Sequence, residues 1–404
     1  MKKVLFVCEH LPNEGGIGPA LLNQIESMDR KLYDISLCLV CNYVDKSVRI
    51  PEYVHLIKGS KMMEYHIVNY EKRKKEYGVF QRIIMLAMKQ VRRKIGFQQY
   101  QKLALKNFHL KEKYDVAIAY SNDICKNGIP ISGGSNYFVT NCVEADSKVA
   151  WIHNEVEHQG FTHEYCLKAF KPYKFIVNVS ESCKRLFDNM VPEYSSKSIY
   201  IYNIIDYEKI YIKAKACIPQ VMNSPKLKLV TAARMEENQK RISRIIDCCD
   251  RMVACGIDDF IWIVLGDGPD YNKYVKMVND KNLCKYVVFM GHQDNPYVFM
   301  KNADIFVLPS LYESFGLVLK EALAVGCPVV TTDFQASHEI VEDNVNGIIC
   351  ENSSDGIYKA ISIIANNLEY LNKLKTNISK CKQNLNVIAK EQFNTMMEEC
   401  NNGQ

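Results

Sequence analysis

The chain has 404 residues, of which 48% are hydrophobic and 24% charged. This composition is that of an ordinary globular protein, so it excludes a disordered chain, a collagen and a coiled coil; the length predicts two or three domains. The formal net charge of +5 is too small to indicate nucleic-acid binding by itself. Sixteen cysteines are scattered through the chain, many in apolar runs, so we expect free thiols in a reducing compartment.

Two short stretches imitate targeting or metal signals. The apolar run Val4–Cys8 is shorter than the ~7–15 residues of a signal-peptide core, and no run reaches the ~18–20 residues of a membrane span. Cys38 and Cys41 have the spacing of a redox or zinc motif, but no second such pair exists, and we expect two core cysteines on a strand. The sequence therefore predicts a cytoplasmic protein and leaves open peripheral binding at the inner face of a membrane.

Short β-branched runs alternate with amphipathic helical stretches, which is typical of parallel strands joined by crossover helices. Residues 206–225 have weak periodicity and two prolines, and we expect them to link two doubly wound α/β domains. Such sheets bind ligands outside the carboxyl ends of their strands, so the expected site is the cleft between the domains. The expected strands are 4–8, 35–40, 116–120, 149–153, 175–179 and 199–202, then 227–232, 262–265, 287–290, 305–308, 329–332 and 347–350.

The segment from Lys58 to Lys113 has fifteen basic and four acidic residues, so its net charge is +11 while the remaining chain carries −6. An apolar stripe recurs in it at helical spacing: Phe80, Ile84, Met88, Val91 and Ile95. A basic amphipathic helix is a candidate for binding an anionic membrane surface. The alternative is a helix whose apolar stripe packs on its own domain, and the pattern does not separate the two.

A glycine-rich turn, Gly15-Gly16-Ile17-Gly18, lies between the first strand and a helical run from Ala20. Backbone amides of such a turn can approach a phosphate. No glycine stands three residues after Gly18, so this is not the dinucleotide-binding fingerprint, and an ordinary strand-to-helix turn fits equally well.

The strongest chemical signal lies in Leu308–Val330. A strand leads into a loop with Glu313, and a helix is expected to begin near Phe315 and to end at Gly326. The amides of residues 315–317 would lie at the helix N-terminus, where they can bind anionic or hydroxyl oxygens. Glu321, further along the helix, can accept hydrogen bonds from both hydroxyls of a ribose diol.

The segment Glu313–Val330 resembles the hallmark of glycosyltransferase family 4, two glutamates separated by seven residues in the context E-(S/G)-F-G-x-x-x-x-E-A-x-A-x-G-x-P-V-V. Other family motifs follow in the expected order: Gly15-Gly16-Ile17, Trp151-Ile152-His153-Asn154, Asn203-Ile204-Ile205-Asp206, Arg234 with Lys240, Gly266-Asp267-Gly268-Pro269 and Asn346-Gly347. The chain is thus similar to a retaining nucleotide-sugar glycosyltransferase of the GT-B fold, with two Rossmann-like domains facing across a cleft.

The resemblance implies a role for each site residue. Arg234 and Lys240 would hold the donor diphosphate, as a guanidinium and an ammonium suit phosphoryl oxygens. Glu321 would bind the ribose, Glu313 would lie beside the donor sugar, and His153 would contact the donor sugar and the acceptor region. The expected catalytic residues are Glu313, His153, Arg234 and Lys240; the expected donor-binding residues are Gly15, Gly16, Ser314, Phe315, Gly316, Leu317, Glu321, Arg234 and Lys240.

The chain departs from the family at the diphosphate loop. The family usually has glycine where this chain has Ala233 and Arg241, and two glutamates, Glu236 and Glu237, add negative charge to the loop. These departures motivate an alternative, a non-catalytic sugar-binding partner subunit. A nucleotide-sugar epimerase or a sugar phosphorylase on the same fold also remains open.

The implied reaction moves a hexosyl or N-acetylhexosaminyl group from a nucleoside diphosphate sugar to a hydroxyl, in cell-surface polysaccharide or glycolipid synthesis. Front-side displacement and a covalent route through Glu313 both remain open. No metal and no other cofactor is expected, because two cations would neutralise the diphosphate and no two aspartates stand two positions apart. The expected partners are the donor, a lipid-linked or polysaccharide acceptor and, through residues 58–113, an anionic membrane surface, with no nucleic acid.

The resemblance also gives the expected domains. Residues 1–205 would form the acceptor-side domain and 226–385 the donor-nucleotide domain, with 206–225 between them. Residues 386–404 would form a C-terminal helix and tail that could pack back on the N-terminal domain.

Overall fold

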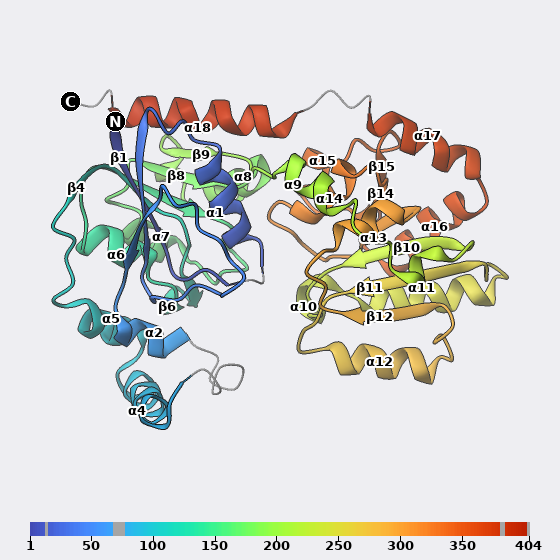
Figure 1. Cartoon of the computed structure of the whole chain (residues 1–404), viewed down its shortest axis with the longest axis horizontal. Coiled ribbons are helices and arrows are strands. Elements are labelled where there is room, and N and C mark those ends of the chain that lie inside the picture. The colour runs from blue at the N-terminus through green and yellow to red at the C-terminus, as the bar shows by residue number, and fades with distance from the viewer. Residues whose placement is uncertain (13–14, 68–76, 380–383, 402–404) are drawn as a thin grey trace. The chain divides into compact units, whose positions relative to one another are not determined.

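The computed structural model describes residues 1–12, 15–67, 77–379 and 384–401. They form two compact units (Figure 1): unit 1 comprises Met1–Ile204 and the segment that begins at Leu385, and unit 2 comprises Ile205–Asn384. Each unit is built on a parallel sheet with crossover helices. The predicted α/β class with two doubly wound sheets is confirmed.

Unit 1 has a seven-stranded parallel sheet in the order β3-β2-β1-β4-β7-β8-β9 and a separate hairpin, β5-β6. The strands are β1 (Lys2–Cys8), β2 (Tyr33–Leu39), β3 (His55–Lys58), β4 (Lys113–Ala119), β5 (Ile124–Lys126), β6 (Ile129–Ser132), β7 (Glu144–Ile152), β8 (Phe175–Asn178) and β9 (Ser198–Tyr200). The helices are α1 (Ile17–Glu26), α2 (Lys61–Ile67), α4 (Val79–Ile95), α5 (Phe97–Leu105), α6 (Ser135–Asn141), α7 (His163–Ala169), α8 (Glu181–Met190), the 3₁₀ turn η1 (Pro192–Tyr194) and α18 (Leu385–Asn401).

The six strands expected in this half are all present, with ends shifted by a few residues. Strand β3 was missed because it is a short edge strand whose side chains are mostly exposed, so it lacks an apolar run. Cys38 lies in β2 and Cys41 just after it, and both thiols are buried, as the core interpretation predicted.

Both faces of this sheet are buried, as expected for a parallel sheet. One face packs on α5 to α8 in a single core cluster. On the other face the rings of Tyr120 and Trp151 lie 4.9 Å apart, and the ring of Phe393 from α18 lies 6.4 Å from Trp151. Helix α18 is also tied to β7, because the Ser147 hydroxyl donates to the Cys400 carbonyl at 2.8 Å. The last helix of the chain is thus part of unit 1.

The basic segment forms a helical excursion of unit 1, made of α2, α4 and α5, and its residues 68–76 lie outside the described residues. The predicted apolar stripe does not form one free face. Met88 and Val91 pack on the core of unit 1, whereas Phe80 and Ile95 are exposed, at 75% and 41%. Part of this stripe therefore packs on its own domain, which is the alternative weighed for it, and part of it is exposed.

Unit 2 has a six-stranded parallel sheet in the order β12-β11-β10-β13-β14-β15. The strands are β10 (Leu227–Ala232), β11 (Phe260–Leu265), β12 (Val287–Gly291), β13 (Ile305–Leu308), β14 (Val329–Thr332) and β15 (Gly347–Cys350). The helices are α9 (Tyr207–Lys213), the 3₁₀ turn η2 (Gln220–Asn223), α10 (Glu237–Lys240), α11 (Ser243–Ala254), α12 (Tyr271–Asp280), α13 (Tyr297–Asn302), α14 (Leu317–Ala324), α15 (Ser337–Ile340), α16 (Ser354–Ala365) and α17 (Leu368–Ile378).

The core of unit 2 is centred on Trp262 of β11, which is fully buried. Its indole N–H donates to the Thr231 hydroxyl at 3.1 Å, and that hydroxyl donates to the Val307 carbonyl at 2.7 Å, so no polar atom of this group is left unpaired. These hydrogen bonds join the neighbouring strands β11, β10 and β13 inside the core.

Residues 206–225 are structured and belong to unit 2, which differs from the expected linker. The Asp206 carboxylate caps α9 by accepting from the Lys209 amide at 2.9 Å, and α9 packs on α13 and α14. The short length of α9 and the two prolines conceal this helix in the sequence.

Over the described ranges, we find no helix that combines the length and the apolar character needed to cross a lipid bilayer.

Candidate functional site

The predicted residues of unit 2 gather where β10 and β13 lie side by side. The connection after β10 leads to one side of the sheet, whereas β13 and β14 continue on the other side. Ligands of doubly wound sheets bind at the carboxyl ends of the strands at such a switch point. The loop after β10 carries Arg234, the short helix α10 that follows ends at Lys240, and the loop after β13 carries Glu313.

Lys240 and Glu313 form an ion pair in which Nζ lies 2.5 Å from Oε1. The Ser310 hydroxyl donates to the same oxygen at 2.6 Å, while among the described residues Oε2 has only a 3.4 Å contact to the Gln239 amide. Glu313 is 7% exposed, so the pair is withdrawn from water and its hydrogen bonds are charge-assisted. The predicted catalytic carboxylate and the predicted phosphate cation are therefore neighbours, and one carboxylate oxygen retains acceptor capacity.

The loop that holds Glu313 is fixed by side chains the sequence did not single out. The Arg244 guanidinium of α11 donates to the Pro309 carbonyl at 3.0 Å and to the Asn352 side chain at 2.6 Å. Asn352 in turn donates to the Leu311 carbonyl at 2.9 Å. These residues lie about 70 and 40 positions away from the motif, so no local pattern could have indicated them.

Helix α14 begins at Leu317, two residues later than expected. Gly316 is its N-cap and has a φ of +80°, a left-handed conformation that glycine adopts without strain. Ser314 and Phe315 precede it and are buried, at 9% and 3% exposed. The α14 N-terminus thus follows directly on the Glu313 loop, and its macrodipole favours negative charge at that point.

Glu321 lies one turn into α14, where it is half-buried, and the desolvation of its carboxyl raises the pKa from 4.5 to about 7. The Tyr297 hydroxyl of α13 donates to its Oε1 at 3.1 Å, and Lys213 at the end of α9 lowers the pKa in part. Among the described residues Oε2 of Glu321 accepts no hydrogen bond, so this carboxylate suits a ligand that donates two hydrogen bonds. Tyr297 was missed because it lies in the short helix α13. Lys213 was missed because it lies in the segment that was expected to be a linker.

Arg234 differs from Lys240 in being exposed: 70% of its side chain is accessible, and its guanidinium lies 3.5 Å from Glu236. Arg241, where the family usually has glycine, has a φ of +50°, which explains why glycine suits that position. The loop is also held from below, because Gly268 leaves no room for a side chain: a Cβ there would lie 2.4 Å from the Met235 carbonyl. The loop after β10 is therefore packed closely against the loop after β11.

His153 lies in unit 1 at the carboxyl end of β7, where its backbone N–H donates to the Asn122 side chain at 3.1 Å. The residue is 7% exposed, and its Nε2 has no hydrogen-bond partner among the described residues. Burial lowers its pKa to about 4, so the imidazole is neutral at neutral pH. A buried ring nitrogen without a partner is an acceptor or donor for a ligand hydroxyl.

Gly15 and Gly16 precede α1, with Gly16 as its N-cap and Gly15 at a φ of +93°. A Cβ at Gly15 would meet no atom within 4 Å, so backbone conformation rather than crowding calls for glycine. They follow β1, the neighbour of β4 at the switch point of this sheet.

Sequence reasoning missed Asp123, which follows β4 at the same edge. Its carboxylate accepts from the Gly134 amide at 2.9 Å and from the Tyr165 hydroxyl at 2.8 Å, while burial raises its pKa to about 6. The run Ser121-Asn122-Asp123 directly after an apolar strand was the signal that could have indicated it.

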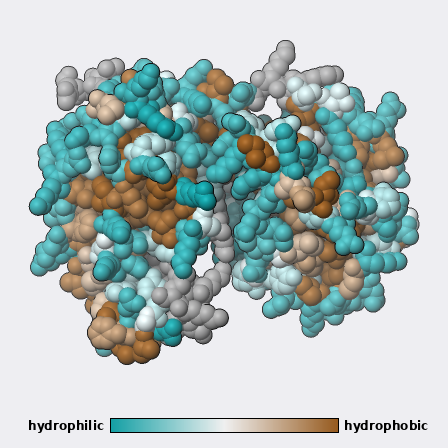
Figure 2. Space-filling model, viewed as in Figure 1, coloured by the Kyte–Doolittle hydropathy of each residue, from teal (hydrophilic) through white to brown (hydrophobic). Residues whose placement is uncertain are grey.

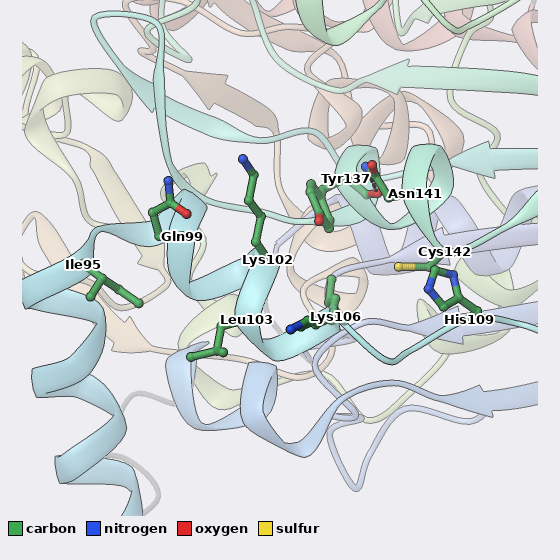
Figure 3. A pocket seen from close by; sticks show the side chains of 10 residues that line it. Ile95, Gln99, Lys102, Leu103, Lys106, His109, Tyr137, Asn141 and Cys142 are labelled. Atoms are coloured by element: carbon green, nitrogen blue, oxygen red, sulfur yellow. Dashed lines mark hydrogen bonds between the residues drawn. The ribbon is translucent and has the colours of Figure 1, made fainter.

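Metal-binding clusters and cavities are the two remaining features that could form a site. In the described part of the chain, no group of three or more His, Cys, Asp or Glu side chains is arranged to hold a metal ion. A pocket of about 720 Å³ lies away from the predicted residues, between α5 and α6 of unit 1, with Lys102, Lys106 and His109 on its wall (Figure 3).

Comparison with known proteins agrees with this geometry. Residues 219–380 match the family described as glycosyl transferases group 1. N-acetyl-alpha-D-glucosaminyl L-malate synthase of Bacillus anthracis is 30% identical over 155 residues, covering 37% of this chain and 39% of the relative. N-acetylgalactosamine-N,N'-diacetylbacillosaminyl-diphospho-undecaprenol 4-alpha-N-acetylgalactosaminyltransferase of Campylobacter jejuni is 27% identical over 182 residues, covering 44% and 47%. The matches thus span less than half of these relatives.

Similarity of fold extends further than similarity of sequence. The crystal structure of Anabaena Alr3699/HepE in complex with UDP and glucose superposes with a TM-score of 0.66 at 15% identity, over 99% of this chain and 100% of the other. The family match covers the loops of Arg234, Lys240 and Glu313 together with Glu321. Residues 219–380 thus match the glycosyl transferases group 1 family, and the chain as a whole has the GT-B fold.

Proposed function

We propose that this protein is a retaining glycosyltransferase of family 4 that moves a hexosyl or N-acetylhexosaminyl group from a nucleoside diphosphate sugar to a hydroxyl. The observation that carries the proposal is the Lys240–Glu313 ion pair at the β10/β13 switch point, inside the region that matches the family. An ordinary surface pair would not be buried against a helix N-terminus.

In this proposal the nucleotide binds unit 2. The two ribose hydroxyls donate to Glu321, and the diphosphate lies at the N-terminus of α14 within reach of Lys240 and Arg234. Arg234 suits this role because its guanidinium is exposed and has only a loose, solvent-accessible partner in Glu236. A phosphate would replace that carboxylate as the better bidentate partner.

The difficult step is departure of the diphosphate, on which negative charge builds as the sugar becomes oxocarbenium-like. In this proposal the cations and the α14 amides stabilise that charge in the transition state. We favour front-side displacement, in which the acceptor proton passes to the leaving phosphate oxygen as the new bond forms on the same face. Glu313 is a poor nucleophile here, because Lys240 and Ser310 both donate to its Oε1.

Glu313 and His153 are then assigned to the sugar rather than to the phosphates. Oε2 of Glu313 accepts a sugar hydroxyl, and the neutral His153 ring offers its unpartnered Nε2 to another hydroxyl. Both roles require hydrogen bonding and no proton transfer at neutral pH.

The acceptor is proposed to be lipid-linked or a polysaccharide, in synthesis of a cell-surface polysaccharide or glycolipid at the cytoplasmic face of a membrane. Support comes from the Campylobacter relative, whose name places its sugar on a diphospho-undecaprenol carrier. The basic segment 58–113 would provide the positive charge needed for work beside anionic lipids.

The test is a donor panel followed by turnover. UDP, GDP, ADP and CMP, and their sugar conjugates, are first compared for thermal stabilisation, because a ligand of the native state raises its melting temperature. The stabilising donor is then incubated with and without acceptors while nucleotide release is measured. Acceptor-dependent release supports the proposal; conversion of donor alone indicates an epimerase, and binding without turnover indicates a non-catalytic subunit.

A further inference from the structure

Helix α4 of unit 1 is apolar on two different sides. Met88 and Val91 pack on the core of the unit. Val79, Ile83 and Leu86, spaced by four and three residues, share another side, on which their exposed fractions are 73%, 59% and 46%. A helix side made of three large exposed apolar residues is unusual on a soluble surface and indicates an occupant.

The same side of α4 continues as a row of cations. Arg93 stands seven residues after Leu86, and Lys89 and Lys94 flank it; all three are exposed, and none has an ion pair within the described residues. From Val79 to Leu105, which spans α4 and α5, the chain has six basic residues and no acidic one. Within Val79–Leu105, therefore, no acidic side chain offsets the positive charge.

Exposed apolar and basic side chains also occur on the elements next to α4. The Arg92 guanidinium donates to the Ile131 carbonyl of β6 at 2.6 Å, which holds the β5-β6 hairpin against α4, and Ile129 and Ile131 are 61% and 42% exposed. In the same last turn of α4, Ile95 lies on the wall of the pocket that also carries Lys102 and Lys106 (Figure 3). Figure 2 shows hydrophobic side chains at the end of the unit where α4 lies in Figure 1.

We propose that Val79, Ile83, Leu86, Lys89, Arg93 and Lys94, the docking face, bind this protein to an anionic lipid bilayer. The apolar side chains enter the boundary between headgroups and acyl chains, while the cations contact anionic headgroups. Charge complementarity selects the occupant. A second copy of this chain, meeting the face by two-fold symmetry, would bring like charges together, whereas lipid phosphates bring the opposite charge.

The first test is flotation of the full chain with vesicles of phosphatidylcholine alone or mixed with phosphatidylglycerol, at low and high salt. We expect binding to the mixed vesicles that weakens at high salt. Removing two cations, Lys89→Gln with Arg93→Gln, should weaken low-salt binding about 30-fold, from the typical contribution of a basic residue near an anionic surface.

The apolar part is tested with Ile83→Ser and Leu86→Ser, which should weaken binding at least about tenfold at both salt concentrations. Matched controls lie in unit 2: Ile363→Ser, at a residue 54% exposed, and Lys276→Gln with Lys373→Gln. The controls should bind as the parent does. Salt-insensitive binding, equal losses in the controls, or self-association through the face in sedimentation would each overturn the proposal.

A second measurement does not depend on loss of binding. Phe80, beside the docking face, is 75% exposed, whereas the chain's own two tryptophans, Trp151 and Trp262, are buried at 1% and 0%. The fluorescence of a Phe80→Trp variant should shift to the blue and be quenched by brominated acyl chains in mixed vesicles. Unchanged emission would overturn insertion of α4. Neither assay contains donor or acceptor, so a failure here is separate from a failure of the proposed transfer reaction.

Discussion

Replacing Glu321 by glutamine should stabilise unit 2 at alkaline pH while weakening nucleotide binding. The residue is half-buried and desolvation raises the pKa of its carboxyl from 4.5 to about 7, so ionising it in the native state costs free energy. Glutamine has the same shape, keeps an oxygen that can accept from Tyr297, and cannot ionise. The same substitution removes the charged acceptor proposed for the ribose hydroxyls.

The magnitude follows from the pKa change. Moving a carboxyl from 4.5 to about 7 corresponds to at most about 3 kcal/mol, at ~1.36 kcal/mol for each pKa unit. Between these values the native state binds more protons than the unfolded state, so the stability of the parent falls as pH rises through that window. The advantage of the Glu321→Gln variant should therefore be under about 1 kcal/mol at pH 5 and reach its full value near pH 8.

The assay is calorimetry of the parent and the variant at both pH values, in which about 2–3 kcal/mol should raise the melting temperature of a unit of this size by roughly 5–10 °C. Glu351→Gln, at an exposed position of the same unit, is the matched control and should behave alike at both pH values. A Glu321→Gln variant no more stable than the parent at pH 8, or equally stabilised at pH 5, would refute the reasoning.

Titration of the same variant with the nucleotide that stabilises the parent should show affinity reduced about 10- to 100-fold, as expected for loss of a charged hydrogen-bond acceptor. Greater stability with weaker binding is the signature of a group held in an unfavourable environment for function. Unchanged affinity would remove Glu321 from the donor site without touching the stability argument.

Three other outcomes are expected. Lys240→Ala should reduce turnover at least about 100-fold while the chain stays folded, because it removes a cation from the developing phosphate charge; Lys276→Ala is the control, and full activity of Lys240→Ala would refute the assignment. Chelation with EDTA should leave the rate unchanged, and strong inhibition would reveal a required metal. Burial lowers the pKa of His153 from 6.5 to about 4, so the free energy of unfolding of the parent should fall as pH falls through that range. Urea unfolding at pH 7 and 4.5 measures this fall. In the His153→Gln variant the fall between the two pH values should be smaller by about 2–3 kcal/mol. An identical pH dependence in both proteins would contradict a buried neutral imidazole.

Local patterns sufficed for most strands of the two sheets. The six expected strands of unit 2 all occur, because each is a compact apolar run between turn residues. The place of the Glu313 loop between a strand and a helix was also predicted, since an apolar run precedes it and a helical run follows it. The Lys240–Glu313 ion pair was not predicted, because the two residues are 73 positions apart, and neither was the left-handed φ of Gly316.

Features that depend on packing could not be predicted this way. Lys320 appears in the sequence as one more helix cation, yet it is 4% exposed and burial lowers its pKa to about 7. The side of α4 that faces the core could not be chosen from the sequence either, because apolar residues occur on two sides. Periodicity gives the spacing of such residues but not which side meets a neighbour.

The position of α18 has a consequence for how the protein is made. Unit 1 needs the last helix of the chain, whose Phe393 covers the Trp151 face of its sheet. During synthesis, that face stays uncovered until all of unit 2 has left the ribosome, so unit 2 is the first region able to finish folding. A fragment that stops at residue 204 would leave Trp151 and its aromatic neighbours exposed and prone to aggregate. Expression of unit 1 alone therefore calls for a chain in which α18 is fused after Ile204.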